Sequence, residues 1–305
     1  MGITPLGPPP VPPLPQPILV TGASGLLGSA ILTRLAGSAT VTGLGRSHAF
    51  PNLLPVNLTD PDAIDSLKAM PWNALVHCAA YRDPDFCETH PEDAAALNTN
   101  VPARLAALAQ SRGAPMVHIS TDYVFDGDHP PYRETSTPCP INRYGQTKRD
   151  AETRVLQACP GAAILRIPAL YGTPPPPVIS SMIEDAIRSV TGTTPTRHDH
   201  ACIRYPTCTA DIADVVAFLL EKGVAGIVHA SATVPATRYE FTLEAARILH
   251  TDPSLISPMD SIPPRAARRP VNSALTVDRL ASLGGPIPKS YQYWLPLILA
   301  DRVKS

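Results

Sequence analysis

A glycine-rich turn near the start of the chain restricts its fold more than any other feature. The apolar run Ile18-Leu19-Val20 leads directly into a turn that contains Gly22, Gly25 and Gly28, and helical spacing follows over residues 29–35. In this Gly-x-x-Gly-x-x-Gly pattern, the first glycine permits a tight turn, the second lets the backbone approach a pyrophosphate, and the third lets the helix pack closely on the strand. Because the turn joins a strand to a helix, it predicts dinucleotide binding rather than a plain structural turn.

The rest of the first half of the chain alternates between short apolar segments and segments with helical spacing. The apolar segments cover residues 41–44, 74–80, 116–120 and 164–167, and the longest helical segments cover residues 91–110 and 144–158. Buried strands that alternate with helices form parallel sheets with both faces covered. The predicted fold class is therefore α/β, with a Rossmann-type, doubly wound parallel sheet over residues 18–172.

Prolines mark the borders of this domain. The chain has 37 prolines among 305 residues, well above the usual share of about 5%. Eight lie in residues 1–17, which we expect to be a disordered proline-rich tail, with a polyproline ligand of an SH3-type domain as the alternative. A run of four at 174–177 ends the strand–helix alternation. Residues 173–305 are predicted to form a smaller C-terminal α+β substrate-binding lobe, with a boundary that elements of the chain can cross.

Composition excludes several classes of function. Hydrophobic residues make up 44% of the chain, enough for a sizeable core, and the net charge is -1. Such a balance supplies no field that attracts nucleic acid or an anionic membrane, and no apolar run reaches the length of a membrane span. The six cysteines include no Cys-x-x-Cys pair, and the group from His198 to Cys202 matches no zinc spacing. We therefore expect a cytoplasmic protein with reduced thiols and no metal site.

A tyrosine and a lysine four residues apart are the strongest candidates for catalysis. Tyr144 and Lys148 lie in a predicted helix, so they share one helix face. The lysine charge favours the tyrosinate, which predicts a phenol pKa lowered toward neutrality and suited to proton transfer at a carbonyl. Thr121 stands at the end of a predicted strand, where ligands bind in open α/β sheets, and it is expected to orient the carbonyl oxygen.

The end of the second predicted strand indicates which dinucleotide binds. NAD sites usually place an acidic residue there for the ribose 2′-hydroxyl, whereas NADP sites place an arginine. Here the strand ends in Gly45-Arg46-Ser47, without a neighbouring Asp or Glu. Arg46, with Ser47 as a second donor, therefore predicts NADP. The alternative is that Arg46 is an ordinary solvated surface residue.

Several blocks of sequence together resemble the extended short-chain dehydrogenase/reductase superfamily. They are Thr21–Gly28 (TGASGLLG), His77–Ala80 (HCAA), His118–Gly127 (HISTDYVFDG) and Asn142–Lys148 (NRYGQTK). Within the superfamily, the chain is most similar to the dTDP-4-dehydrorhamnose reductase family, and closest to the branch with the regulatory (beta) subunit of methionine adenosyltransferase. The likeness covers about residues 18–300. The segment after HCAA, Tyr81–Asp85, is closer to the beta branch than to the reductases of dTDP-sugars.

This resemblance implies an NADP-binding Rossmann domain and assigns roles to individual residues. Thr121, Tyr144 and Lys148 match the family's catalytic positions, and Asn98 matches an asparagine of the long helix near the site. The cofactor-binding residues expected from the glycine turn, the second strand and the resemblance are Gly22, Ser24, Gly25, Leu26, Leu27, Gly28, Arg46, Asn57, Leu58, Cys78, Ala79, Ala80, Tyr81, Asn98, Tyr144, Lys148 and Ile167.

The leading hypothesis from the sequence is an NADP-dependent oxidoreductase that reduces a carbonyl of a small polar metabolite, with Tyr144 as proton donor. The main alternative is a non-catalytic, NADP-binding regulatory subunit whose partner is a methionine adenosyltransferase-like enzyme. A second copy of the chain is another candidate partner. An epimerase or dehydratase with a tightly held cofactor is the third hypothesis. The sequence leaves the substrate and the direction of reaction open.

Overall fold

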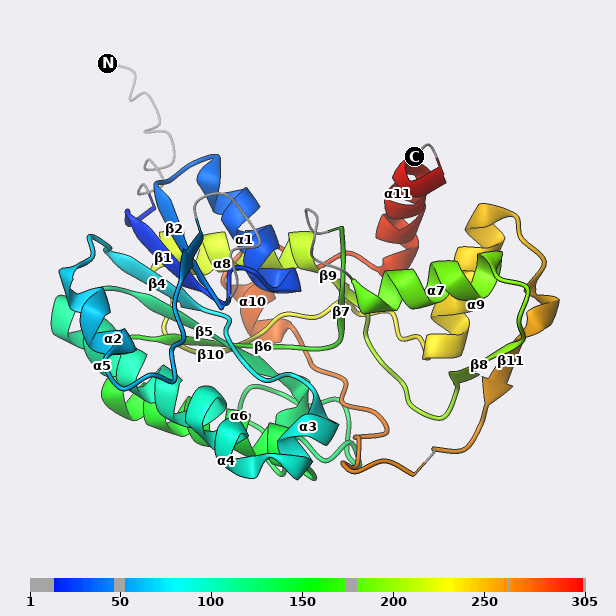
Figure 1. Ribbon diagram of the computed structural model, residues 1–305, viewed down its shortest axis with the longest axis horizontal. Coiled ribbons are helices and arrows are strands. Elements are labelled where there is room, and N and C mark those ends of the chain that lie inside the picture. Colours follow the sequence, from blue (N-terminus) through cyan, green and yellow to red (C-terminus); the bar gives the residue numbers. More distant parts are fainter. Residues whose placement is uncertain (1–13, 47–52, 174–179, 263, 304–305) are drawn as a thin grey trace, which may run out of the picture.

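The computed structural model describes residues 14–46, 53–173, 180–262 and 264–303, which form two lobes of unequal size (Figure 1). The larger lobe contains the central sheet and most of the first half of the chain. Ser47 and the prolines at 174–177 lie outside the described residues, as do residues 1–13 of the expected tail. Within the described ranges, no helix is both long and apolar enough to span a membrane.

The central sheet contains seven parallel strands in the part of the chain that the structure describes. They are β1 (Ile18–Thr21), β2 (Val41–Gly45), β3 (Leu53–Pro55), β4 (Ala74–His77), β5 (Met116–Thr121), β6 (Ala163–Ile167) and β10 (Gly226–His229). Their order is β3-β2-β1-β4-β5-β6-β10, and every pairing is parallel. The chain moves outward from β1 and then crosses back to β4, which opens a crevice where the order reverses. The predicted Rossmann-type fold class is confirmed.

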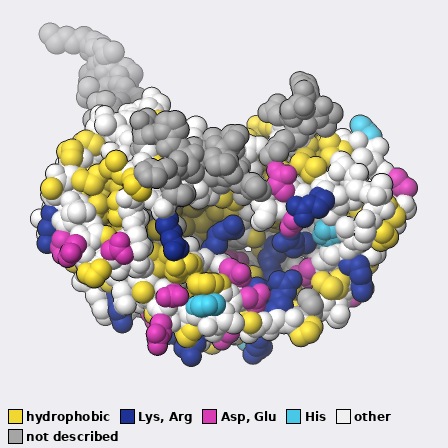
Figure 2. All heavy atoms as spheres, in the orientation of Figure 1, with side chains coloured by type: hydrophobic (Ala, Val, Ile, Leu, Met, Phe, Trp, Pro, Cys, Tyr) yellow, Lys and Arg dark blue, Asp and Glu magenta, His cyan; other side chains and the backbone are white. Residues whose placement is uncertain are grey.

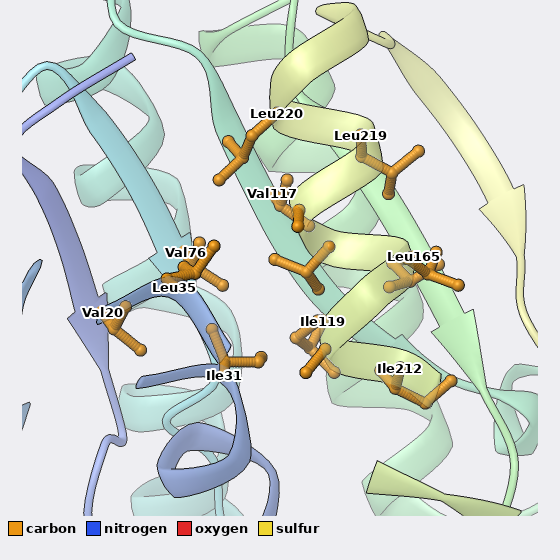
Figure 3. Close-up of a cluster of buried hydrophobic side chains, with 14 of the residues drawn as sticks. Val20, Ile31, Leu35, Val76, Val117, Ile119, Leu165, Ile212, Leu219 and Leu220 are labelled. Carbon is orange, nitrogen blue, oxygen red and sulfur yellow. The ribbon is translucent and has the colours of Figure 1, made fainter. Parts of the chain in front are cut away.

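Two helices cover one face of the sheet, α1 (Leu26–Ala36) and α8 (Thr209–Lys222). Successive side chains of a strand point to opposite faces, so one set from the strands of the sheet meets these helices. Figure 3 shows this core, which includes Val20, Val76, Val117, Ile119 and Leu165 from the strands and Ile31, Leu35, Ile212, Leu219 and Leu220 from the helices. The packing fixes the start of α1 directly after β1, at the carboxyl end of the sheet.

The opposite face is covered by α5 (Val101–Arg112) and α6 (Arg143–Ala158), with α2 (Ala63–Ser66) and the 3-10 turn η1 (Leu67–Ala69) beside them. Leu19, Leu75 and Ile164 point to this side. The helix expected over residues 91–110 is continuous, but it consists of α4 (Pro91–Ala95), a π-helical turn η2 (Ala96–Asn100) and α5. The π turn faces α6, where the Thr99 hydroxyl donates to the backbone oxygen of Thr147 at 2.9 Å.

The smaller lobe is built from α7 (Ser181–Thr191), α9 (Arg238–Leu249) and α11 (Tyr291–Val303), together with a parallel pair, β8 (Thr196–Asp199) and β11 (Ile256–Met259). Ile183, Phe241 and Leu295 belong to its own hydrophobic core. The remaining elements are β7 (Leu170–Tyr171), which pairs with β9 (Thr207–Cys208), and α3 (Pro84–Thr89), α10 (Asp278–Ser282) and the 3-10 turns η3 (Asp122–Val124) and η4 (Pro253–Leu255).

Elements from the second half of the chain return to the larger lobe. Both α8 and β10 come after residue 173, yet α8 covers the central sheet and β10 pairs with β6. A later segment, residues 266–276, runs back along the larger lobe. In this segment the Ala267 N–H donates to Asp85 at 2.9 Å, the Arg268 carbonyl accepts from Asn142 at 2.7 Å, and the Thr276 N–H donates to the Tyr132 carbonyl at 2.8 Å. The lobes are thus joined by more than one crossing of the chain.

Residues 14–17, which we expected to belong to the tail, pack against the larger lobe. Leu14 is buried in the core that α1 and α8 form with the sheet. The Gln16 side chain accepts a hydrogen bond from the Thr40 N–H at 3.0 Å, and the Pro17 carbonyl accepts one from the Asn73 N–H at 2.7 Å. The ordered part of the chain therefore extends at least four residues further toward the N-terminus than the sequence suggested.

Candidate active site

A cleft of about 490 Å³ lies at the carboxyl ends of the central strands, where the strand order reverses. Its described walls come from the loops after β1, β2, β3, β4, β5 and β6, and from the start of α1, the π turn η2 and the first turns of α6. Figure 2 shows the molecule hollowed between the two lobes, with Lys and Arg side chains along the hollow. This is the position at which open α/β sheets bind their ligands.

The glycine turn forms one end of the cleft by a close approach of backbone segments. Gly22 has φ +67°, and a Cβ added to it would lie 2.6 Å from the Ala79 nitrogen. A Cβ on Gly28 would lie 2.2 Å from the Gly22 oxygen. Larger residues at either position would push β1, β4 and α1 apart. The first turn of α1, which begins at Leu26 after Gly25, therefore presents its free N–H groups to the cleft, as an anion-binding helix terminus requires.

Nearly all the residues predicted from the sequence line this one cleft. They are Gly22, Ser24, Gly25, Leu26, Leu27, Gly28, Arg46, Asn57, Leu58, Cys78, Ala79, Ala80, Tyr81, Thr121, Tyr144, Lys148 and Ile167. Sequence reasoning did not place Val56, Thr59, Arg82, Asp122, Tyr123 and Ala169 among the site residues, although they line it as well. The signal that could have found Asp122 and Tyr123 is their place directly after Thr121, at the carboxyl end of a predicted strand.

Asn98 alone of the predicted set does not line the cleft. Its fully buried amide lies in the π turn and clamps the backbone of Tyr81, accepting from the Tyr81 N–H at 2.8 Å and donating to the Tyr81 oxygen at 2.9 Å. It also donates to the Thr147 hydroxyl at 3.2 Å. The structure thus gives Asn98 a supporting place, in which it holds the Tyr81 wall of the cleft against α6.

The helix that carries Tyr144 and Lys148 is fixed firmly at its start. Asn142 caps α6, with its side-chain oxygen accepting from the Gly145 N–H at 2.8 Å. A Cβ on Gly145 would lie 2.1 Å from the Tyr123 oxygen, so only glycine lets α6 come this close to the end of β5. The Tyr144 ring meets the Tyr123 ring edge-on, with centroids 6.0 Å apart. Tyr144 is therefore held beside the segment that presents Thr121.

Thr121 ends β5 and begins the turn η3. Its hydroxyl accepts from the Tyr123 N–H at 3.2 Å and donates to Asp122 at 3.1 Å. The second oxygen of Asp122 accepts from Ser273, in the segment that returns from the smaller lobe. Burial raises the pKa of Asp122 above its usual range, while these hydroxyl groups and Arg204 act in the opposite direction.

The electrostatics of the tyrosine differ from the prediction. Burial raises the pKa of Tyr144 well above its usual value, and the neighbouring Thr121 hydroxyl only partly opposes this. The pKa lowered toward neutrality that we expected from Lys148 is therefore wrong for this arrangement. Burial also lowers the pKa of Lys148 to about 8, because a charge that is 3% exposed has lost most of its hydration.

Arg46 directly follows β2 at the cleft and is exposed, so its guanidinium is accessible to a phosphate group. Its guanidinium donates to the Tyr81 hydroxyl at 3.4 Å, across the opening between the loops after β2 and β4. Among the described residues, no group of three or more His, Cys, Asp or Glu side chains is placed to hold a metal ion. In the segment from His198 to Cys202, the His198 ring forms hydrogen bonds with the Ser189 and Thr196 hydroxyls, and the His200 ring forms one with the Thr237 hydroxyl.

Comparison with known proteins places this site in a family. Residues 16–303 match the family described as "RmlD substrate binding domain". The chain is 38% identical over 280 residues to methionine adenosyltransferase 2 subunit beta of Danio rerio, covering 88% of this chain and 84% of that protein. It is also 38% identical over 272 residues to a probable dTDP-4,6-dihydroxy-2-methyloxan-3-one 4-ketoreductase of Streptomyces antibioticus, covering 87% of this chain and 88% of that protein.

One solved structure matches this chain in fold and over most of the length of both chains. The dTDP-4-dehydrorhamnose reductase from Bacillus anthracis, determined in complex with NADP, superposes with a TM-score of 0.84 at 25% sequence identity. The match covers 93% of this chain and 98% of that one. The chain therefore belongs to the RmlD substrate-binding-domain family of extended short-chain dehydrogenases/reductases.

Proposed function

We propose that this protein is an NADPH-dependent reductase that converts a carbonyl of a small polar metabolite to a hydroxyl. The observation that carries the proposal is the single cleft that gathers the glycine turn, Arg46, Thr121, Tyr144 and Lys148. The NADP complex of the related reductase and the ketoreductase name of the Streptomyces relative support it. The cytoplasmic location inferred from the sequence stays a prediction.

The residues present fit a dinucleotide phosphate. The backbone cradle at Gly22 and Gly28 excludes side chains where a pyrophosphate would approach, and the N-terminus of α1 attracts its charge. Arg46 would hold the 2′-phosphate, and Lys148 would donate to the ribose of the nicotinamide half. NADPH, when bound, supplies the hydride that reduces the carbonyl carbon.

Side chains of the protein then supply the proton and stabilise the charge that its transfer leaves. Because burial raises the pKa of Tyr144, its phenol is protonated at neutral pH and can donate the Oη proton to the carbonyl oxygen as that oxygen gains charge. With its single proton turned from Asp122 to the substrate, the Thr121 hydroxyl would donate a hydrogen bond to the same oxygen and orient it. The Lys148 ammonium, on the same helix face, stabilises the phenolate that remains. A protonated phenol suits the reductive direction, since oxidation would start from the tyrosinate.

Steady-state NADPH oxidation with a panel of carbonyl compounds tests the proposal. The panel includes 4-keto-6-deoxy sugars, free and linked to nucleoside diphosphates, because the reductase relatives are named for such substrates. We expect turnover with at least one member. Absence of turnover across the panel by protein that binds NADPH would contradict the reductase proposal.

Replacing Arg46 by alanine should reduce the preference for NADPH over NADH. A charge-assisted contact to the 2′-phosphate contributes about 1.5–3 kcal/mol, so we expect NADPH affinity to fall by roughly 10- to 100-fold while NADH affinity changes little. Fluorescence titration with both cofactors measures this. Arg34→Ala is the matched control, because Arg34 pairs with Asp214 on α8 away from the cleft. Equal losses for both cofactors would contradict the role of Arg46.

The rate should also depend on pH through Lys148. Burial lowers the pKa of this lysine to about 8, so the free protein carries the ammonium below that pH and loses it above. Since the ammonium is the form that binds the ribose and stabilises the phenolate, kcat/KM should be level near pH 7 and fall about tenfold per unit above pH 8. A kcat/KM profile that stays level to pH 10 would exclude this role.

A second candidate function is supported by the 38% identity to methionine adenosyltransferase 2 subunit beta. In this case the chain binds NADP and regulates a catalytic methionine adenosyltransferase subunit. Size-exclusion chromatography with light scattering, using the catalytic subunit from the same organism, tests it. A stable complex without carbonyl turnover favours the regulatory function, whereas turnover without a complex favours the reductase.

A further inference from the structure

Beneath the cleft, Lys148 contacts a histidine that the proposed mechanism does not use. The Lys148 Nζ lies 3.2 Å from the Nε2 of His118, which comes from the neighbouring strand β5. His118 is 0% exposed and Lys148 is 3% exposed, so water does not readily replace either partner. Residue 118 lies three positions before Thr121 and points to the α6 side of the sheet.

Chemistry fixes the direction of this hydrogen bond. A lysine ammonium has three donors and no acceptor, so Lys148 donates and the His118 Nε2 accepts. The proton of the neutral imidazole is then on Nδ1. Burial and the Lys148 charge lower the pKa of His118 well below its usual value, which keeps the ring neutral and able to accept.

The other ring nitrogen of His118, Nδ1, is in a less favourable environment. It has no hydrogen-bond partner among the described residues. The ring stacks on His77 of β4, with centroids 5.3 Å apart, and the His77 Nδ1 is 2.6 Å from the Thr21 hydroxyl. A buried N–H without a partner destabilises the fold, and an apolar residue of similar size would avoid that cost. The contact with Lys148 is what a histidine provides here and an apolar side chain does not.

Other charged and titratable groups near Lys148 do not replace this acceptor. On its own helix, Glu152 is one turn further on, but both of its carboxylate oxygens bind Arg166 of β6, at 2.9 and 2.6 Å. Tyr144 lies one turn before Lys148. At the end of β4, burial lowers the pKa of His77 to about 3 and raises that of the Cys78 thiol, which follows the strand, to about 12, so neither is charged at neutral pH.

We propose that His118 is a positioning residue that fixes the Lys148 ammonium under the cleft through a hydrogen bond accepted at Nε2. Lysine has a flexible four-carbon stem, and a fixed acceptor below the cleft restricts where its ammonium can lie. The remaining two donors of Lys148 then stay available toward the ribose and Tyr144. That Lys148 acts in catalysis rests on the proposed function, whereas the hydrogen bond from Lys148 to His118 does not.

The hydrogen bond can be measured without any substrate. The chain has five lysines, so lysine labelled with ¹³C at Cε gives few signals, and Lys148→Met identifies the one that belongs to Lys148. We expect this signal to titrate near pH 8 in the native chain. Loss of the acceptor in His118→Leu disfavours the ammonium, so the midpoint should move about one pH unit lower. His118→Gln, which restores an acceptor, should recover most of that shift.

His77→Leu is the matched control, since His77 is the strand neighbour of His118, but in the described structure its Nδ1 bonds to Thr21 and its Nε2 forms no hydrogen bond to Lys148. Its Lys148 midpoint should equal the native one. An unchanged midpoint in His118→Leu would overturn the proposal. Should that variant fail to fold, long-range ¹H–¹⁵N spectra of the native histidines decide the matter, because the proposal requires an unprotonated Nε2 on His118 and a protonated Nε2 would contradict it.

Activity and cofactor binding separate this proposal from the proposed function. If the native protein reduces a carbonyl, the fall of kcat/KM with pH should begin about one unit lower in His118→Leu than in the native protein and in His77→Leu. The pH at which NADPH affinity begins to fall should move lower by the same amount in His118→Leu. If the native protein turns over no substrate, the reductase proposal fails, and the lysine titration still shows whether His118 holds Lys148.

Discussion

Tyr144→Phe is expected to lower kcat by about 10³-fold while NADPH affinity stays within about twofold of native, because a positioned general acid contributes roughly 10²–10⁴ in rate. Phenylalanine keeps the ring that meets Tyr123 edge-on and removes only the donor oxygen. The substrate oxygen would then take its proton from water, at a site that the cleft walls shield. Steady-state kinetics with the best carbonyl substrate, together with NADPH fluorescence titration, measure both quantities.

Tyr171→Phe is the matched control for that experiment. The Tyr171 hydroxyl is buried without a hydrogen-bond partner among the described residues, and the residue does not line the cleft. Its removal should leave kcat and NADPH affinity at native values. A Tyr144→Phe protein that is as active as Tyr171→Phe would show that the proton comes from another group.

Glu152→Gln should cause the largest loss of stability, about 3–5 kcal/mol in the free energy of unfolding, because it leaves a buried guanidinium without its counter-charge. Glu152 and Arg166 form a bidentate pair between α6 and β6, with side chains 4% and 1% exposed. Ser120 donates to the same carboxylate from β5. The pair therefore ties the helix of Tyr144 and Lys148 to two central strands. Urea denaturation followed by circular dichroism measures the loss.

Two further variants separate a buried-charge effect from a general effect on α6. Asp150→Asn breaks the exposed pair with Arg149 on the same helix and should cost less than about 1 kcal/mol. Replacing both partners, in Glu152→Leu with Arg166→Met, should recover much of the loss, since no charge is left buried. If Glu152→Gln costs no more than Asp150→Asn, the pair does not stabilise the site as described.

The parts of the site that lie close together in sequence were predictable. The glycine turn is defined by one strand, one turn and one helix, so its spacing alone places Gly22, Gly25 and Gly28 in the cleft. Tyr144 and Lys148 share a helix face because four residues make about one turn. The alternation of apolar and helical segments likewise indicated the parallel sheet, since each unit of that pattern is local.

Contacts between distant segments were not predictable in this way. The placement of Asn98 depends on a π turn that packs on α6, and neither the turn nor its partner Thr147 has a local signal. Both α8 and β10 follow the prolines at 174–177 in the sequence, yet they pack on the central sheet, and no local pattern indicates these contacts. The burial of Leu14 was not predictable either. The prolines around it are typical of an extended tail, and the core that receives its side chain is formed by distant segments.

The tyrosine shows a second limit of sequence reasoning. Helical spacing places Lys148 near Tyr144 and suggests a lowered phenol pKa, yet spacing says nothing about burial. In the structure, burial raises the pKa of Tyr144 and lowers that of Lys148, and the lysine's hydrogen bond goes to His118. Desolvation thus outweighs the single charge pair, so Tyr144 is a phenol at neutral pH and not a group with a pKa lowered toward neutrality.

Transfer of deuterium from the cofactor to a product shows whether the protein catalyses hydride transfer to a carbonyl carbon. NADPH with both C4 hydrogens replaced by deuterium is incubated with the native protein and the best substrate of the carbonyl panel, and the product is analysed by mass spectrometry. We expect an alcohol that carries one deuterium at the former carbonyl carbon, formed by native protein and not by Tyr144→Phe at comparable times. A product without the label, or NADPH that binds to the protein and is never oxidised by any member of the panel, would show that the protein is not such a reductase.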